Sequence, residues 1–232
     1  MRKTTLLIGN TDGIGAEMTC ELLGQGHQVI GISRSPSKIS HPNYSHIQLD
    51  VAALNFRTNL SECLQSISKL DLCIYLAGIG QELNLSDLRS ETKVFEVNLM
   101  GAVIATELVL EKMQTQNSGH FIGISSLGDM LISPESPSYT ASKIGLSRYW
   151  EGLGLALKKK KSPLKITNVR FGFVDTKMAK APVRPLQISR KEAVMFLQDV
   201  IERPRIRASK PKLMIPLVGM VGLAAKLKVM FE

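Results

Sequence analysis

The sequence has little cysteine and few aromatic residues, and each shortage argues against a class of protein. Its three cysteines, Cys20, Cys63 and Cys73, are widely spaced and odd in number, so they suggest neither a disulfide framework nor a zinc site. We therefore expect a reducing compartment, the cytoplasm, and no metal ion. The chain has 4 Tyr, 7 Phe and 1 Trp and lacks a nucleic-acid recognition motif. No nucleic-acid partner is expected, despite a net charge of +9.

Long hydrophobic runs are missing as well. The longest candidate, residues 213–225, has 13 residues and contains Pro216 and two glycines. A helix that spans a bilayer needs roughly 18 to 20 apolar residues, so none is predicted. The apolar stretch that follows Arg2 and Lys3 is also too short for a signal peptide.

What is present is the composition of an ordinary globular domain. Of the 232 residues, 44% are hydrophobic and 21% charged, and the chain includes 18 Gly and 10 Pro. Short apolar runs alternate with longer amphipathic segments, which is typical of parallel strands joined by crossover helices. The sequence therefore predicts an α/β fold, a single Rossmann-type, doubly wound parallel sheet of about seven strands flanked by helices. Residues 1–232 are expected to form one domain.

The expected strands lie near residues 4–9, 28–33, 46–49, 72–77, 120–125, 165–170 and 213–216. The expected helices cover residues 14–25, 54–68, 92–115, 141–160 and 189–203, with a short last helix after Val218. In such a sheet, ligands bind beyond the carboxyl ends of the strands, where the strand order reverses.

A glycine-rich turn follows the first expected strand. It reads Gly9, Asn10, Thr11, Asp12, Gly13, Ile14 and Gly15. Glycines let the backbone approach a diphosphate, and the amides at the start of the next helix supply a positive end. Taken alone, the same pattern also fits a tight turn that binds nothing.

Other motifs follow at fixed places along the chain. Tyr139 and Lys143 form a Tyr-x-x-x-Lys motif, Ser126 lies 13 residues before Tyr139, and Asn98 lies within Val-Asn-Leu-Met-Gly. Asp-Val at 50–51, Ala-Gly at 77–78 and Gly-x-x-x-Thr at 172–176 complete the set. With the glycine turn, these motifs resemble the short-chain dehydrogenase/reductase family over nearly the whole chain.

The resemblance implies an NAD(P)(H)-dependent oxidoreductase that interconverts a carbonyl and an alcohol, with hydride transfer at the pro-S face. It implies that the catalytic residues are Asn98, Ser126, Tyr139 and Lys143. The expected cofactor contacts are Gly9, Asn10, Thr11, Asp12, Gly13, Ile14, Gly15, Ser33, Arg34, Asp50, Val51, Ala77, Gly78, Asn98, Tyr139, Lys143, Gly172, Val174 and Thr176.

The chemistry of these residues fits that role. A free tyrosine has a pKa near 10, so proton transfer at neutral pH needs a neighbouring positive charge. Lys143 lies one helical turn from Tyr139 and is expected to lower the tyrosine pKa, while its amine reaches the cofactor ribose as the resemblance implies. Ser126 is placed to bond the substrate oxygen, and Asn98 is expected to hold a water that relays protons to Lys143. Taken singly, each residue also fits a purely structural role.

The end of the second expected strand bears on the choice between NAD and NADP. An acidic residue there favours NAD, whereas an arginine suits the 2′-phosphate of NADP. Ser33 stands where the acid would be and Arg34 follows it, which favours NADP(H) and leaves NAD(H) as the alternative. Asp12 argues the other way, because a carboxylate near a phosphate is unfavourable.

Three positions depart from the family pattern. Ile8 replaces a threonine, Tyr75 and Leu76 replace an Asn-Asn pair, and Phe171 replaces a proline. The second change is expected to remove polar groups that tie the central strands together, and cofactor affinity could fall. These departures motivate a second hypothesis, a non-catalytic nucleotide-binding or regulatory Rossmann protein.

A short substrate lid is expected near residues 173–190. Apolar residues follow Ser126 and Gly172, which suggests a small apolar carbonyl or alcohol substrate, although they could also only pack the lid. A homodimer or homotetramer is expected through the helices that carry Asn98 and Tyr139.

The end of the chain is basic. Residues 202–232 hold seven basic and two acidic residues, a net charge of +5, around the apolar run 213–225. The favoured expectation is a last strand and a short helix that close the sheet. A weak contact of this tail with a membrane surface is the alternative.

Overall fold

The computed structural model describes residues 3–179 and 182–231. Residues 180 and 181 of the predicted lid and residue 232 of the basic tail lie outside the described part, as do residues 1 and 2. The described chain forms one parallel sheet of seven strands in the order β3-β2-β1-β4-β5-β6-β7. The strands are β1 (Thr4–Ile8), β2 (Gln28–Ser33), β3 (Tyr44–Gln48), β4 (Leu72–Tyr75), β5 (His120–Ser126), β6 (Lys165–Phe171) and β7 (Arg207–Lys210). The predicted fold class is confirmed, and the strand order reverses between β1 and β4.

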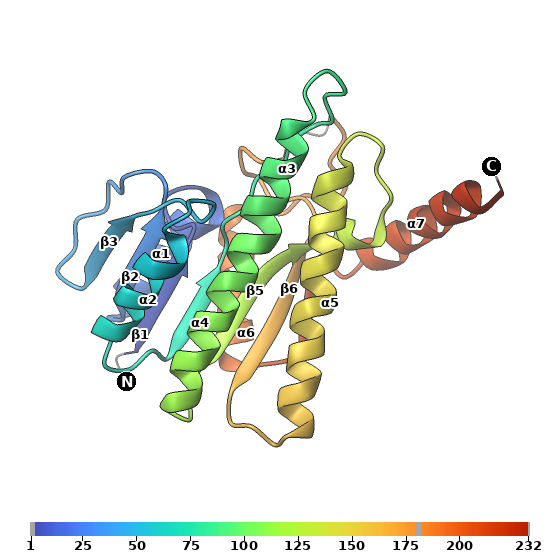
Figure 1. The fold of residues 1–232 in the computed structure, drawn as a ribbon. Coiled ribbons are helices and arrows are strands. Elements are labelled where there is room, and N and C mark those ends of the chain that lie inside the picture. Colours follow the sequence, from blue (N-terminus) through green and yellow to red (C-terminus); the bar gives the residue numbers. More distant parts are fainter. Residues whose placement is uncertain (1–2, 180–181, 232) are drawn as a thin grey trace.

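Helices cover both faces of the sheet (Figure 1). On one face lie α1 (Gly13–Gly24) and α6 (Arg190–Glu202), and on the other α2 (Phe56–Ser66), α4 (Gly101–Thr115) and α5 (Pro137–Lys159). Strand side chains alternate between the two cores: Leu6 and Ile8 of β1 pack in one, and Leu7 in the other. Because both faces are covered, the central strands β1, β2, β4 and β5 are mostly apolar, which is why the sequence predicts them well.

The predicted helix 92–115 is one continuous run with a change of pitch inside it. It consists of α3 (Arg89–Phe95), a π-helical turn over Glu96–Met100 and α4. The π turn holds Asn98, and such turns are frequent at functional sites. Buried Tyr75 donates a hydrogen bond of 3.0 Å to the carbonyl of Val97 in this turn. The hydroxyl of Tyr75 therefore links β4 to the π turn, and the expected loss of polar groups that tie the central strands together stays a prediction.

The C-terminal prediction needs correction. The last strand is β7 at Arg207–Lys210, and the apolar run that the sequence assigns to a strand at 213–216 begins α7 (Met214–Phe231). β7 lies at the edge of the sheet and pairs only with β6, so a mostly polar strand with one buried residue, Ala208, is sufficient there. Its weak apolar signal explains the error.

Helix α7 also overturns the expectation that no segment is long and apolar enough to cross a membrane. It has 18 residues and a mean hydropathy of 1.7. The helix is longer than the apolar run 213–225 suggests because it continues through Lys226 and Lys228. Only 17% of its residues are buried. Length and composition alone do not separate a membrane helix from a helix that packs on protein.

The predicted lid leaves the sheet after β6 and returns at the start of α6. Its two ends are joined by a short parallel bridge between Val174 and Ile188. The amide of Ile188 donates to the carbonyl of Phe173 at 2.9 Å, and the amide of Asp175 donates to the carbonyl of Ile188 at 2.9 Å. These bonds hold the described ends of the lid together over the carboxyl edge of the sheet.

Candidate active site

The turn after β1 packs directly on the end of β4. Gly9 has a φ of +91°, and a Cβ built there would lie 2.5 Å from the backbone nitrogen of Ala77. A Cβ on Gly15 would lie 2.0 Å from the carbonyl oxygen of Gly9. Only glycine fits at both positions, so the motif is required for this close approach. The first turn of α1 thus begins at the strand-order reversal, where its unpaired amides suit an anion.

Asp12 caps α1 and also meets the lid. Its Oδ1 accepts a hydrogen bond of 2.7 Å from the amide of Gly13, and its Oδ2 lies 3.1 Å from Nζ of Lys177. The hydrogen bond with Lys177, followed by the one from Gly13, lowers the pKa of Asp12. The methyl carbon of Thr176 also lies near the turn, 3.3 Å from a Cβ built on Gly13. The positive charge of Lys177, which lies in the lid, therefore offsets the negative charge of Asp12. In the sequence, that charge is the reason to expect poor binding of a phosphate at this turn.

Ser126 and Tyr139 meet at the carboxyl end of β5. Tyr139 lies in the first turn of α5, and its side chain is hydrogen-bonded to Ser126. Burial raises the pKa of Tyr139, and this hydrogen bond offsets part of the rise. The Ser126 hydroxyl also accepts a bond of 3.0 Å from the amide of Gly128. The two hydroxyl groups are thus placed side by side, as the sequence predicts.

Lys143 lies one turn after Tyr139 and is buried, with an exposed fraction of 5%. Its Nζ donates a hydrogen bond of 3.1 Å to the carbonyl of Ile124 and lies 5.7 Å from the centre of the Tyr139 ring. Burial lowers the pKa of Lys143 to about 8. The expected lowering of the Tyr139 pKa by Lys143 is not found in this structure, in which burial raises the tyrosine pKa and the amine bonds to Ile124.

Asn98 faces the same site from the π turn. Its Oδ1 accepts from the amide of Ile79 at 2.7 Å, and its Nδ2 donates to the carbonyl of Ile79 at 2.9 Å and to Ser142 at 3.2 Å. A Cβ built on Gly78 would lie 3.3 Å from Oδ1 of Asn98 and 3.6 Å from Nζ of Lys143. The four predicted catalytic residues therefore converge, but Asn98 bonds to protein groups at both ends of its amide. Its role as a water holder stays a prediction.

We expect the Lys143→Met variant to change how the free energy of unfolding depends on pH. The pKa of Lys143 is about 8 in the folded protein, below its ordinary value of 10.5. Between these values unfolding takes up a proton, so this lysine makes the wild type more stable as pH rises, by up to about 1.4 kcal/mol per pH unit. In denaturant titrations from pH 7 to pH 10, the free energy of unfolding of the wild type should rise relative to that of the variant. Parallel pH profiles for the two proteins would contradict the assigned pKa.

The loop after β2 presents Arg34 to solvent. The carbonyl of Arg34 accepts a hydrogen bond of 3.0 Å from Gln48, and the Ser33 hydroxyl donates to the carbonyl of Ser35 at 3.0 Å. Within residues 3–179 and 182–231, the Arg34 guanidinium has no hydrogen-bond partner. The loop is fixed through other groups, so this side chain is available to a ligand.

Asn10 joins the glycine turn to β3 through residues that sequence reasoning missed. Its Nδ2 donates a hydrogen bond of 2.5 Å to the hydroxyl of Tyr44, which lies 3.3 Å from Nδ1 of His46. Asn10 Oδ1 is a buried acceptor without a partner in the described part of the chain. A Cβ on Gly31 would lie 2.1 Å from Nδ2 of Asn10, so β2 needs glycine there. Tyr44 and His46 belong to no motif, and their alternation in β3 indicates only a strand.

The remaining predicted cofactor residues border the same edge. Asp50 accepts a hydrogen bond of 2.9 Å from the amide of Ala52, and Val51 is buried. A Cβ on Gly172 would lie 2.5 Å from the sulfur of Met214, so Gly172 is in contact with α7. Their direct contact with a cofactor stays a prediction.

A buried polar network behind Ser126 was not predicted. Arg170 Nη2 lies 2.5 Å from Oδ1 of Asp129, and Ser147 donates to the other Asp129 oxygen at 2.5 Å. Ser147 also bonds to Ser125 at 3.0 Å, and Ser125 donates to Asn168 at 2.5 Å. The network ties the turn after Ser126 to β5, β6 and α5. Its members are far apart in the sequence, so spacing gives no signal for it.

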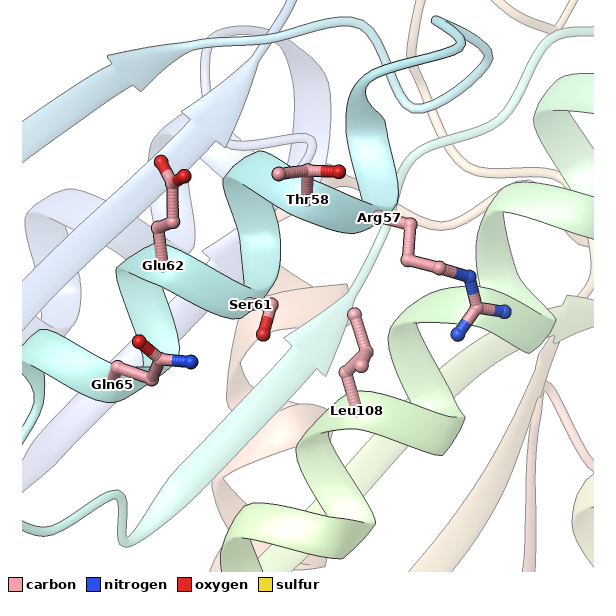
Figure 2. Close-up of a pocket in the computed structure, with 6 residues that line it drawn as sticks. All are labelled: Arg57, Thr58, Ser61, Glu62, Gln65 and Leu108. Carbon is pink, nitrogen blue, oxygen red and sulfur yellow. The ribbon is translucent and has the colours of Figure 1, made fainter.

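A surface hollow of about 490 Å³ lies between α2 and α4 (Figure 2). Its lining is mostly polar and includes one apolar residue, Leu108; the lining residues are Arg57, Thr58, Ser61, Glu62, Gln65 and Leu108. Arg57 turns toward α4 and pairs with Glu107 at 2.5 Å. None of the residues described above lines this hollow, so it is separate from the candidate active site.

Comparison with known proteins gives a consistent result. The family model described as short chain dehydrogenase matches residues 3–185. An uncharacterized oxidoreductase of Mycobacterium tuberculosis strain H37Rv is 27% identical over 226 residues, which cover 90% of this chain and 88% of that protein. A 3-ketodihydrosphingosine reductase of Bacteroides thetaiotaomicron is 30% identical over 157 residues, 65% of this chain and 56% of that protein.

Solved structures share the fold. A short chain dehydrogenase from Burkholderia cenocepacia in complex with NADP has a TM-score of 0.83 at 21% identity, covering 99% of this chain and 95% of that one. A short chain dehydrogenase/reductase from Burkholderia phymatum in complex with NAD has a TM-score of 0.84 at 17% identity, covering 98% and 95%. Both cofactors therefore occur among proteins with this fold.

Proposed function

Because this chain belongs to the short-chain dehydrogenase/reductase family, we propose that it is an NADP(H)-dependent oxidoreductase that interconverts a carbonyl and an alcohol. The observation that carries the proposal is the convergence of Ser126, Tyr139 and Lys143 opposite the glycine turn. A proton donor, a neighbouring hydroxyl and an amine thus share one edge of the sheet.

The residues present suit a nicotinamide dinucleotide. Gly9 and Gly15 bring the backbone close enough that any Cβ would clash, which leaves a cradle beside the α1 amides for a diphosphate. Lys143 and Asn98 flank Gly78, where amine and amide groups could hold ribose hydroxyls. When bound, the dinucleotide supplies or accepts the hydride.

The mechanism follows from the order of the side chains. In the reductive direction, the Tyr139 hydroxyl donates its proton to the carbonyl oxygen as negative charge develops there. Ser126 donates a hydrogen bond to the same oxygen and stabilises that charge. Protonated Lys143 would favour the tyrosinate that remains, provided its Nζ leaves Ile124 for the ligand. Alcohol oxidation reverses these proton transfers.

The preference for NADP is supported by Arg34. Its guanidinium is exposed at the end of β2 and lacks a partner among the described residues, while Ser33 takes the place of a carboxylate that would repel a phosphate. Lys177 pairs with Asp12 and so offsets the one carboxylate in the glycine turn. NAD remains the alternative cofactor.

Arg34→Ala should weaken NADPH binding by about 10-fold to 100-fold, because a charge-assisted hydrogen bond contributes about 1.5 to 3 kcal/mol. The affinity for NADH should change less than threefold, which corresponds to a change in binding free energy of about RT or less. Fluorescence titration of the pure protein with each dinucleotide measures both. Lys160→Ala removes an exposed cation at the far end of α5 and serves as the control for net charge. Equal losses for NADPH and NADH would contradict the role of Arg34, and no binding of either would contradict the proposed function.

The substrate proposal is a small apolar carbonyl or alcohol. An apolar cluster adjoins Ser126; its members include Leu127, Met130, Leu131, Phe173 and Met214. The rival function, a nucleotide-binding protein without turnover, rests on the departures from the family pattern at Ile8, Tyr75, Leu76 and Phe171. Substrate turnover that is lost in the Tyr139→Phe variant would exclude this rival.

We also propose a cytoplasmic homo-oligomer. The compartment is supported by three free cysteines, of which two are buried. Association through α4 and α5 is supported by exposed or partly exposed apolar residues such as Leu155 and Ile104. Light scattering behind a sizing column would measure the mass, and a monomer at micromolar concentration would contradict this assembly.

A further inference from the structure

Helix α7 projects from the body of the protein (Figure 1). Apolar side chains are exposed along most of its length. Beyond its first two turns the apolar residues that are exposed are Met220, Val221, Leu223, Leu227, Val229, Met230 and Phe231. Phe231 has an exposed fraction of 82% and Met230 one of 76%. Such a patch is unusual on a soluble surface and indicates a site for a partner.

The exposed residues do not form a single stripe. Counted at 100° per residue from Val221, Val229 lies at about 80°, Met230 at about 180° and Leu227 at about 240° around the helix. A protein groove covers one face of a helix, which calls for a stripe with a polar opposite face. Apolar residues on several sides suit lipid better, because lipid tails surround an inserted helix.

The charge of the segment fits an anionic surface. Residues 203–231 include seven basic residues and no acidic one. Three of the basic residues are arginines that pair within the protein, with Asp199 and Glu151. The other four are lysines at the two ends of α7: Lys210, Lys212, Lys226 and Lys228. Lysines that flank an apolar helix bind anionic headgroups while the helix enters the interface.

The first half of α7 is docked on the protein. Met214 and Val218 are buried against Leu127. A Cβ on Gly222 would lie 1.9 Å from the carbonyl oxygen of Met130, so the helix backbone touches the turn after Ser126. An 18-residue helix is about 27 Å long, close to the thickness of a hydrocarbon core. Spanning a bilayer would, however, require this docked half to leave the protein, so the geometry favours insertion of the second half alone.

We propose that α7 docks the protein on an anionic lipid bilayer, with the first half of the helix held on the protein and its second half inserted into the lipid. Docking through α7 brings the turn after Ser126, and the apolar cluster beside it, toward the lipid surface. The occupant of this surface is therefore lipid rather than a second copy of the chain.

Co-sedimentation with vesicles tests the proposal without cofactor or substrate. The full-length protein should bind vesicles that contain both phosphatidylglycerol and phosphatidylcholine. Its affinity for vesicles of phosphatidylcholine alone should be at least about tenfold lower. Met230→Glu should weaken binding to the anionic vesicles by at least about tenfold, and the double variant with Leu227→Glu further still. Both side chains are exposed, so the variants should fold, which circular dichroism can check.

Leu54→Glu is the matched control, since Leu54 is fully exposed before α2 and should leave binding unchanged. Equal loss of binding in this control would overturn the proposal, as would no binding by the wild type. A dimer that the α7 variants convert to a monomer, with no vesicle binding, would assign the surface to a second copy instead. Resistance of the bound protein to carbonate extraction would show a spanning helix and overturn the insertion of the second half alone.

Discussion

Tyr139→Phe is expected to lower kcat by about 10²-fold to 10⁴-fold while leaving the protein folded and able to bind NADPH. The variant removes the hydroxyl that stands beside Ser126 and keeps the ring that packs near Lys143. Losing a positioned general acid has an effect of this size. Steady-state oxidation of NADPH with an accepted carbonyl substrate measures kcat, and fluorescence titration measures binding.

Tyr149→Phe provides the control on the same helix. Tyr149 is a partly buried residue of α5 that packs against the core, and it lies outside the candidate active site. This variant should keep kcat within about twofold, a change below 0.5 kcal/mol. A Tyr139→Phe enzyme that retains more than a tenth of wild-type kcat would show that another group donates the proton.

Arg170→Leu should cost about 3 to 5 kcal/mol of the free energy of unfolding. Arg170 and Asp129 are each only 6% exposed at the side chain, and removing the arginine leaves a buried carboxylate without its cation. Asp129 lies in the turn after Ser126, so the loss should also loosen the chain at Ser126. Urea denaturation followed by circular dichroism measures the change.

The exposed pair of Arg57 with Glu107 supplies the comparison. Its side chains are 50% and 41% exposed, so Arg57→Leu should cost at most about 1 kcal/mol. If Arg170→Leu proves too unstable to purify, Asp129→Asn tests the same contact with a smaller change in shape. A cost below 1 kcal/mol for both Arg170→Leu and Asp129→Asn would mean that the network does not hold this turn.

The positions of Ser126, Tyr139 and Lys143 could be predicted from sequence because these residues lie at the ends of strongly patterned elements, while their expected catalytic roles come from the family resemblance. Ser126 ends a buried strand, and Tyr139 and Lys143 are one turn apart on a helix, so element type alone brings them to one edge. The glycine turn could be predicted equally well, because close backbone contact at Gly9 and Gly15 excludes any other residue type at these positions.

Contacts between distant elements could not be predicted. The bond from Tyr75 to Val97 and the pair of Arg170 with Asp129 join residues that no spacing rule connects. The bonds from Asn98 to Ile79 depend on a π turn, for which the apolar pattern of the helix gives no signal.

The C-terminal error has a different cause. An edge strand needs few apolar residues, so β7 with its single buried Ala208 looks like a loop in the sequence. The apolar residues 213–216 therefore look like the last strand in the sequence, although residues from Met214 onward belong to α7. The same error concealed the exposed helix on which the membrane proposal depends.

The most direct test of the central claim is transfer of deuterium from NADPH labelled at its pro-S position. The wild-type protein is incubated with a panel of small apolar aldehydes and ketones, and mass spectrometry then follows the label in the alcohols. With the wild type, we expect deuterium on the former carbonyl carbon of at least one alcohol. With the Tyr139→Phe variant, we expect no labelled alcohol over the same time. Tight NADPH binding with no labelled alcohol from any member of the panel would contradict the assignment as an oxidoreductase of this substrate class.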